Sequence, residues 1–305
     1  QHLFNTSVDT VILWITVKWR PKFIFSFSRL KVLFNYGWKL LVSGLIDTIY
    51  NELRQLLIGK LYTTSDLAYY NQGKKIPGYL ATNINNAIDS VLLPAMSKEQ
   101  SHRDTVKNMT RRAVKISTYV MMPIMMGIAV CANSFVQLIL SDKWMPCVPY
   151  IQICCFTYSF YIIHTANLNA IKALGRSDLF LKLEIVKKIV GLGILLFSIR
   201  YVVFAMACFG IVESILSQII NSWPNAKLLK YNYFEQLKDI IPNILITVIM
   251  GVIVYMINFL SLGSVKTLFI QIPLGILIYI IPSIIFKIDS YYYVLNTLRN
   301  FKNKR

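Results

Sequence analysis

The chain has 305 residues, of which 55% are hydrophobic and only 15% are charged, and its mean hydropathy is +0.53. A soluble domain carries about 25% charged residues, so this composition excludes an ordinary soluble protein. Several apolar runs of about 20 residues match the hydrocarbon thickness of a bilayer. They predict a polytopic membrane protein.

The formal net charge of +18 is explained by membrane topology, because the basic residues gather in alternate loops. In the predicted topology, 24 of the 32 lysines and arginines lie in these loops, and the intervening loops hold few. Basic loops of a membrane protein face the cytoplasm. We therefore expect a cytoplasmic C-terminus and no nucleic-acid partner.

The first apolar run, Leu3 to Val17, is short and carries Asp9. We expect the sequence to start inside a membrane span, with further helices preceding it. Pro21 ends this span because proline cannot continue a helix. Residues 20–33 are then predicted to form a cytoplasmic linker.

Eight full membrane spans are predicted after the linker. Each is expected to be a helix, because a spanning segment must satisfy its own backbone and no alternating strand pattern occurs. The very short connection at Arg200 predicts an antiparallel hairpin of two spans. The predicted spans are 34–58, 76–95, 117–140, 148–171, 180–199, 202–222, 240–260 and 267–286.

A polar face runs along the span 34–58. Asp47 and Arg54 lie two helical turns apart on one side, about 10 Å from each other, and Asn51 shares this face. Such a face is too costly against lipid and must point to the interior or to water. Arg54 is a candidate partner for an anionic headgroup, and Asp47 or Glu52 for a coupling cation or proton. Alternatively, Asp47 and Arg54 pair with each other or with neighbours only to fix helix packing, or Arg54 reaches to the outer interface.

The span 76–95 repeats this polar pattern, with Asn86 and Asp89 on a common face. Amides and a carboxylate suit the hydroxyl groups of sugars. They equally suit hydrogen bonds between membrane helices, so both interpretations remain open.

Two weaker polar stripes occur in later spans, one around His164 and one around Glu213. A lone histidine in a span is more often a packing residue that is held by hydrogen bonds. Glu213 is the lone carboxylate of its span, which makes it a candidate coupling site.

Nothing in the sequence favours catalysis. The loops are short, and the chain lacks a phosphate-binding loop, a nucleophile elbow and a zinc-protease motif. None of the five cysteines has metal-ligand spacing. We therefore expect a protein that is not an enzyme and that holds no metal or cofactor.

Several short motifs, in order along about 150 residues, resemble those of polysaccharide-export proteins. They are Trp19-Arg20-Pro21, Phe34-Asn35-Tyr36-Gly37, Asp66-Leu67-Ala68-Tyr69-Tyr70-Asn71, Leu93-Pro94-Ala95-Met96-Ser97, Lys143-Trp144 and Ala173-Leu174-Gly175-Arg176-Ser177. The pattern is similar to that of lipopolysaccharide or O-antigen (Wzx-type) flippases, within the multidrug/oligosaccharidyl-lipid/polysaccharide exporter superfamily. Ala68 stands where these flippases usually have glycine. The Asp66–Asn71 motif lies between the spans 34–58 and 76–95, and we expect it to form a short aromatic loop.

This resemblance implies a MATE-like, all-α fold of two six-helix bundles around a cavity, with extra C-terminal helices. Residues 1–19 would be the last helix of a truncated N-terminal bundle, and 34–222 the C-terminal six-helix bundle. Residues 240–286 would form two additional helices, and 287–305 a cytoplasmic tail.

The resemblance also implies a flippase of the bacterial inner membrane that works by alternating access for lipopolysaccharide, capsule or exopolysaccharide biosynthesis. Its substrate would be an oligosaccharide on undecaprenyl diphosphate, and its partners membrane lipid, a polysaccharide polymerase and the chain-length machinery. Coupling to a proton or to sodium is left open. The candidate substrate-binding residues are Lys39, Asn51, Arg54 and Asn86, and the candidate ion-coupling residues are Asp47, Glu52, Asp89 and Glu213.

Three alternatives remain. A drug/cation antiporter of the same superfamily would use an acidic, aromatic cavity without a required cation. A membrane-bound polymerase or ligase would need catalytic groups in a periplasmic loop. A scaffold of the glycan assembly machinery would not transport at all.

Overall fold

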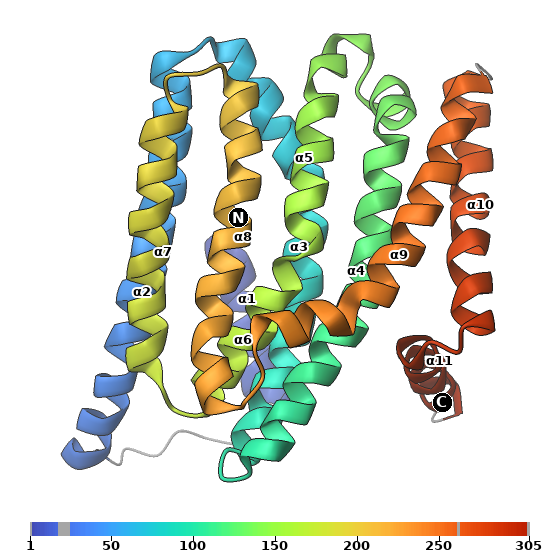
Figure 1. Cartoon of the computed structure of the whole chain (residues 1–305). Helices are drawn as coiled ribbons and strands as arrows, with labels where there is room; N and C mark the ends of the chain where they lie inside the picture. Colours follow the sequence, from blue (N-terminus) through green and yellow to red (C-terminus); the bar gives the residue numbers. More distant parts are fainter. Residues whose placement is uncertain (1, 18–24, 261–262, 304–305) are drawn as a thin grey trace. The chain divides into compact units, whose positions relative to one another are not determined.

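The computed structural model describes residues 2–17, 25–260 and 263–303, and every regular element in these ranges is helical (Figure 1). The chain divides into two compact units, residues 1–38 and 39–305. The first unit contains α1 (His2–Thr16) and the start of α2 (Phe27–Leu61). The motif Trp19-Arg20-Pro21 lies outside the described residues.

The second unit contains the rest of α2 and all later helices. These are α3 (Thr64–Lys98), α4 (Arg103–Ile139), η1 (Asp142–Cys147), α5 (Val148–Ser159), α6 (Tyr161–Ala173), α7 (Ser177–Ser198), α8 (Val203–Leu228), α9 (Tyr233–Met256), η2 (Ile257–Leu260), α10 (Ser264–Ile285) and α11 (Asp289–Asn303).

Five helical segments of the described chain are long and apolar enough to cross a membrane. They are Arg103–Ile139, Asp142–Ala173, Val203–Leu228, Tyr233–Leu260 and Ser264–Ile285. The predicted class, an all-α membrane helix bundle, is therefore confirmed. The other predicted full spans, 34–58, 76–95 and 180–199, fall within α2, α3 and α7, which carry charged side chains inside their apolar runs.

The start of α3 differs from the sequence expectation. The Asp66–Asn71 motif was predicted to be an aromatic loop, but it forms the first turns of α3. Thr63 caps the helix: its hydroxyl accepts from the Asp66 amide (3.1 Å), and the Asp66 carboxylate accepts from the Thr63 amide (3.3 Å). This reciprocal capping satisfies amides that the first turn leaves free, so the aspartate of the motif has a structural role.

The predicted span 148–171 is broken. Phe160 separates α5 from α6, so the segment consists of two short helices. The Ser159 hydroxyl donates to the Cys155 carbonyl (2.8 Å), and such bonds to the preceding turn bend helices.

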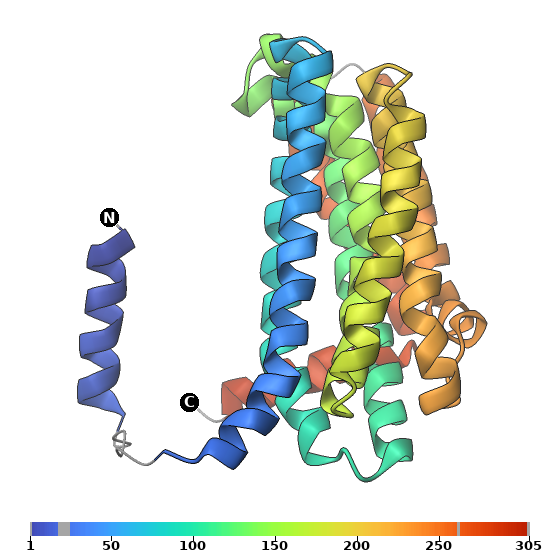
Figure 2. The same ribbon diagram turned by 90° about the vertical axis from the view of Figure 1, so that its left-hand side faces the viewer.

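The C-terminal segment, predicted to be a tail, contains the helix α11. Lys287 has a φ of 47° at the turn after α10, and Figure 2 shows α11 lying across the bundle near the start of α4. Tyr291 and Val294 pack against apolar residues of α4, α9 and α10. The Arg112 guanidinium lies 3.9 Å from the centre of the Tyr293 ring. These contacts dock α11 on the bundle.

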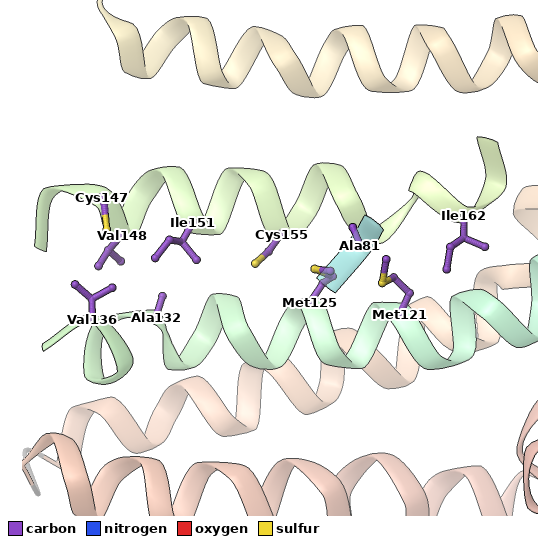
Figure 3. Packing of buried hydrophobic residues seen from close by; sticks show 10 residues of the cluster. All are labelled: Ala81, Met121, Met125, Ala132, Val136, Cys147, Val148, Ile151, Cys155 and Ile162. Carbon is purple, nitrogen blue, oxygen red and sulfur yellow. The ribbon is translucent and has the colours of Figure 1, made fainter. Parts of the chain in front are cut away.

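The largest apolar core joins α3, α4, η1, α5 and α6 (Figure 3). Close approach of α3 and α5 depends on Gly73, because a β-carbon there would lie 2.4 Å from the Tyr150 β-carbon. Small residues commonly allow such packing between membrane helices. The ten buried residues of this core are Ala81, Met121, Met125, Ala132, Val136, Cys147, Val148, Ile151, Cys155 and Ile162.

A hydrogen bond in the apolar interior ties α10 to α4. Pro123 lies inside α4 and has no amide hydrogen, so it cannot donate to the carbonyl of Tyr119 four residues earlier. The Tyr279 hydroxyl donates to this carbonyl instead, at 2.8 Å. The Tyr119 hydroxyl in turn donates to the Ser283 hydroxyl (2.9 Å). A neighbouring helix thus supplies the hydrogen bond that the Tyr119 carbonyl lacks within α4.

Candidate functional site

A buried ion pair connects α2 to α8. The Arg54 guanidinium donates to the Glu213 carboxylate, and also to the Tyr50 hydroxyl at 2.8 Å. The side chains of Arg54 and Glu213 are only 19% and 16% exposed. Burial of charged groups in a membrane bundle is costly unless they are paired, so this pair fixes both side chains toward the interior.

A second ion pair also contacts Tyr50. The Lys188 ammonium of α7 donates to the Asp47 carboxylate at 2.5 Å and lies 4.4 Å from the centre of the Tyr50 ring. The Asn51 amide also donates to Asp47 (3.1 Å). Tyr50 therefore contacts the cations of both pairs. We call the side chains of Asp47, Tyr50, Arg54, Lys74, Lys188 and Glu213 the charged cluster.

Lys74 of α3 completes the cluster as a cation without its own carboxylate. It is half-buried and interacts electrostatically with Arg54, Asp47 and Glu213. Within the described residues it forms no ion pair. A cation beside another cation in a poorly solvated interior favours the binding of an anion.

More polar groups adjoin the cluster on α6, α7 and α8. Lys187 pairs with Glu184 at 2.5 Å, and both side chains are nearly buried. His164 hydrogen-bonds with Asn221 and interacts electrostatically with Lys187 and Lys188. Together, these groups and the cluster contain four cations, Arg54, Lys74, Lys187 and Lys188, and three carboxylates, Asp47, Glu184 and Glu213. These described groups therefore have an excess of positive charge, and they are buried or half-buried except for Asp47, whose side chain is 53% exposed.

A glycine allows the cluster to form. A β-carbon on Gly191 of α7 would lie 2.7 Å from the Tyr50 hydroxyl oxygen and 2.9 Å from a Glu213 carboxylate oxygen. Both distances are shorter than real β-carbon contacts. Gly191 thus leaves the space that Tyr50 and Glu213 occupy.

The structure brings together four of the predicted site residues, namely Asp47, Asn51, Arg54 and Glu213. Asp47 and Arg54 do not pair with each other, but each pairs with a residue of a neighbouring helix, as the packing alternative allows. Whether these residues bind substrate or a coupling ion stays a prediction.

The other predicted residues lie elsewhere. Lys39 is half-buried nearer the start of α2, and Glu52 is exposed. On α3, Asn86 is exposed and Asp89 is half-buried. The neighbouring Asn85, by contrast, is buried and accepts a hydrogen bond of 2.6 Å from Thr165 of α6, so it serves helix packing. Their predicted roles remain predictions.

Sequence reasoning missed Tyr50, Lys74, Glu184, Lys187 and Lys188. The two adjacent lysines were counted among the basic residues of a cytoplasmic loop, but they lie within α7 and form ion pairs. The available signal was that both fall inside the predicted span 180–199, where charge usually marks a polar interior.

An apolar cavity of about 920 Å³ opens between α3, α4, α9 and α10. Lys75 is the only charged residue among the described residues that line it. Most of the others are apolar or aromatic, such as Tyr79, Ile128, Met250 and Ile276. No group of three or more His, Cys, Asp or Glu residues that could hold a metal occurs in the described part of the chain.

Long apolar helices around paired buried charges define a polytopic membrane protein. Residues 1–149 match the family described as "Polysaccharide biosynthesis protein". The fold resembles that of the lipid II flippase MurJ in an inward closed conformation, with a TM-score of 0.70 and 16% identity over 91% of this chain and 59% of MurJ.

Curated relatives carry related names. The chain is 23% identical over 287 residues to the teichuronic acid biosynthesis protein TuaB of Bacillus subtilis (strain 168), covering 92% of this chain and 59% of TuaB. It is 21% identical over 188 residues to the lipopolysaccharide biosynthesis protein WzxC of Escherichia coli (strain K12), covering 61% of this chain and 38% of WzxC. The chain thus spans between about two fifths and three fifths of these relatives. The predicted resemblance to Wzx-type polysaccharide flippases is confirmed.

Proposed function

We propose that this chain is part of a flippase that moves lipid-linked oligosaccharides across the bacterial inner membrane by alternating access. The observation that carries the proposal is the charged cluster, whose Lys74 pairs with no carboxylate of the described residues, inside a fold similar to that of MurJ. The matches to TuaB and WzxC support a role in polysaccharide biosynthesis. The protein acts as a transporter and not as an enzyme.

The chemistry of such a substrate fits the cluster. A glycan that enters hydrocarbon loses its hydrogen bonds to water, which costs several kcal/mol for each unpaired polar group. A polar interior avoids this cost. The diphosphate between glycan and lipid needs cationic partners, and charge-assisted hydrogen bonds from Lys74 and Arg54 would supply them. Lys74 makes the first contact because it has no carboxylate of its own in the described chain.

The apolar cavity suits the lipid part of the same substrate. Lys74 interacts with the charged cluster, while the next residue, Lys75, lines the apolar cavity. Adjacent positions of α3 therefore lead to the two environments that an amphiphilic molecule requires. We infer that the diphosphate binds on the cluster side of α3 and that part of the lipid tail occupies the cavity.

The remaining roles follow from this scheme. Asp47 and Glu213 would carry the coupling proton or sodium ion, since they are the two carboxylates of the cluster. The C-terminus would lie in the cytoplasm, and a polysaccharide polymerase with its chain-length machinery would receive the product. A drug antiporter would instead alter the drug susceptibility of a deletion strain.

The experiment uses a strain that lacks the gene and accumulates lipid-linked repeat units on the cytoplasmic leaflet. The full-length protein should clear this pool, and Lys74→Ala should reduce clearance at least about tenfold, which corresponds to losing about 1.4 kcal/mol of binding. Lys98→Ala is the control, because it removes a lysine from an exposed position in the last turn of the same helix. If Lys74→Ala clears the pool as well as wild type, the proposed anion site is wrong.

A further inference from the structure

The pairing of Arg54 with Glu213 has a consequence for anion binding. Arg54 was expected to bind the substrate's anion, but Glu213 already occupies part of its guanidinium. The Arg54 Nε is buried and has no hydrogen-bond partner in the described chain. The guanidinium therefore retains one free donor, while another is engaged by an anion of the protein itself.

We propose that Glu213 is an internal competitor that holds the place of the substrate's phosphate on Arg54. On this view, which rests on the proposed flippase function, an incoming diphosphate first meets Lys74. It then displaces the Glu213 carboxylate from Arg54 and forms the fork-shaped contact that guanidinium makes with phosphate. Without substrate, Glu213 neutralises the charge of Arg54. A ligand without two adjacent anionic groups does not separate Arg54 from Glu213.

The surroundings of Glu213 make this exchange feasible. Glu213 has neighbours on three helices. They are Tyr50 and Arg54 of α2, Tyr70 and Lys74 of α3, and Gly191 of α7. The Tyr50 hydroxyl interacts with both members of the pair, so it remains available to donate to the released carboxylate. Displacement thus exchanges one anion for another without leaving Arg54 unpaired.

This competition separates α2 from α8 when ligand binds. The pair is the contact by which the Arg54 side chain holds α8, and a diphosphate that replaces Glu213 removes it. If Arg54 is free of Glu213 for only about a tenth of the time, it binds anions about tenfold more weakly than an Arg54 without this competitor. Removing the competitor should therefore raise the affinity for anions, whereas removing a residue that merely orients Arg54 should lower it.

The test measures binding of inorganic pyrophosphate by calorimetry to the purified full-length protein in phosphatidylcholine nanodiscs. Glu213→Gln, which keeps the side-chain shape, should bind pyrophosphate about tenfold more tightly than wild type. Glu235→Gln removes the same charge from an exposed position on α9 and should leave the affinity within twofold. Equal or weaker binding by Glu213→Gln, or no binding by either protein, overturns the proposal.

Two further measurements keep the result clear. If Glu213→Gln does not purify as a folded protein, Glu213→Asp, whose shorter carboxylate reaches Arg54 poorly, should bind more tightly than wild type, and equal or weaker binding overturns the proposal. Clearance of lipid-linked repeat units in cells reports on the proposed function separately. If wild type clears the pool while Glu213→Gln binds pyrophosphate more weakly, the competition is wrong and the flippase function stands.

Discussion

Gly191 of α7 lies so close to Tyr50 of α2 that a β-carbon would come within 2.7 Å of the tyrosine hydroxyl oxygen. The same β-carbon would meet a Glu213 oxygen at 2.9 Å. The missing side chain at position 191 leaves room for Tyr50 and for Glu213, the partner of Arg54. A glycine on α7 thus supports the geometry of side chains on α2 and α8.

Gly191→Ala should disturb the charged cluster. The added methyl group pushes Tyr50 or Glu213 away, and overpacking of this kind costs about 1–3 kcal/mol. We expect a lower melting temperature and at least a severalfold loss of substrate clearance. Gly193→Ala is the control, because a β-carbon there has no atom within 4 Å. Equal effects of the two substitutions would show that Gly191 has no special role.

The class of the protein could be predicted from its apolar runs, because the need to satisfy the backbone in lipid allows few structures. Asp47, Asn51 and Arg54 could be placed on one face of α2 from helical spacing alone. Their partners could not, because the periodicity of one helix carries no information about which helix packs against it. The sequence therefore indicates Glu213 only as an isolated candidate and Lys188 only as a basic residue of a loop, and it does not indicate that they pair with α2.

The breaks in the helices were also beyond sequence reasoning. Pro123 indicates a kink, but the sequence does not show that Tyr279 supplies the missing hydrogen bond from 156 residues further along. The Asp66–Asn71 motif is expected to form a loop because it lies between two apolar runs. The reciprocal cap of Thr63 and Asp66 instead starts α3 there.

Tyr279→Phe should destabilise the bundle by leaving the Tyr119 carbonyl buried without a donor, at a cost of about 1–3 kcal/mol. Pro123→Ala restores the amide hydrogen that α4 lacks, so the carbonyl regains a partner within the helix. The double variant should therefore lose less stability than the sum of the two single variants. Thermal unfolding of the purified full-length protein measures this, and additive losses would refute the role of Tyr279.

Gly73→Ala should destabilise the contact of α3 with α5 more than other glycine substitutions. Its β-carbon would lie 2.4 Å from the Tyr150 β-carbon and 3.1 Å from the Cys147 carbonyl oxygen, so rigid atoms must move. The expected loss is about 3 kcal/mol, at the upper end for overpacking. Gly127→Ala, with no atom within 4 Å, is the control in the same melting experiment. Similar melting temperatures for both variants would contradict the close packing.

The central claim is that the charged cluster carries the diphosphate of a lipid-linked oligosaccharide across the membrane. The most direct measurement is translocation of such a lipid in proteoliposomes that contain the purified full-length protein. The account predicts rapid translocation by wild type and by Lys98→Ala, and at least about a tenfold loss with Lys74→Ala. If the double variant that carries both Lys74→Ala and Arg54→Ala translocates the lipid as fast as wild type, this claim is contradicted.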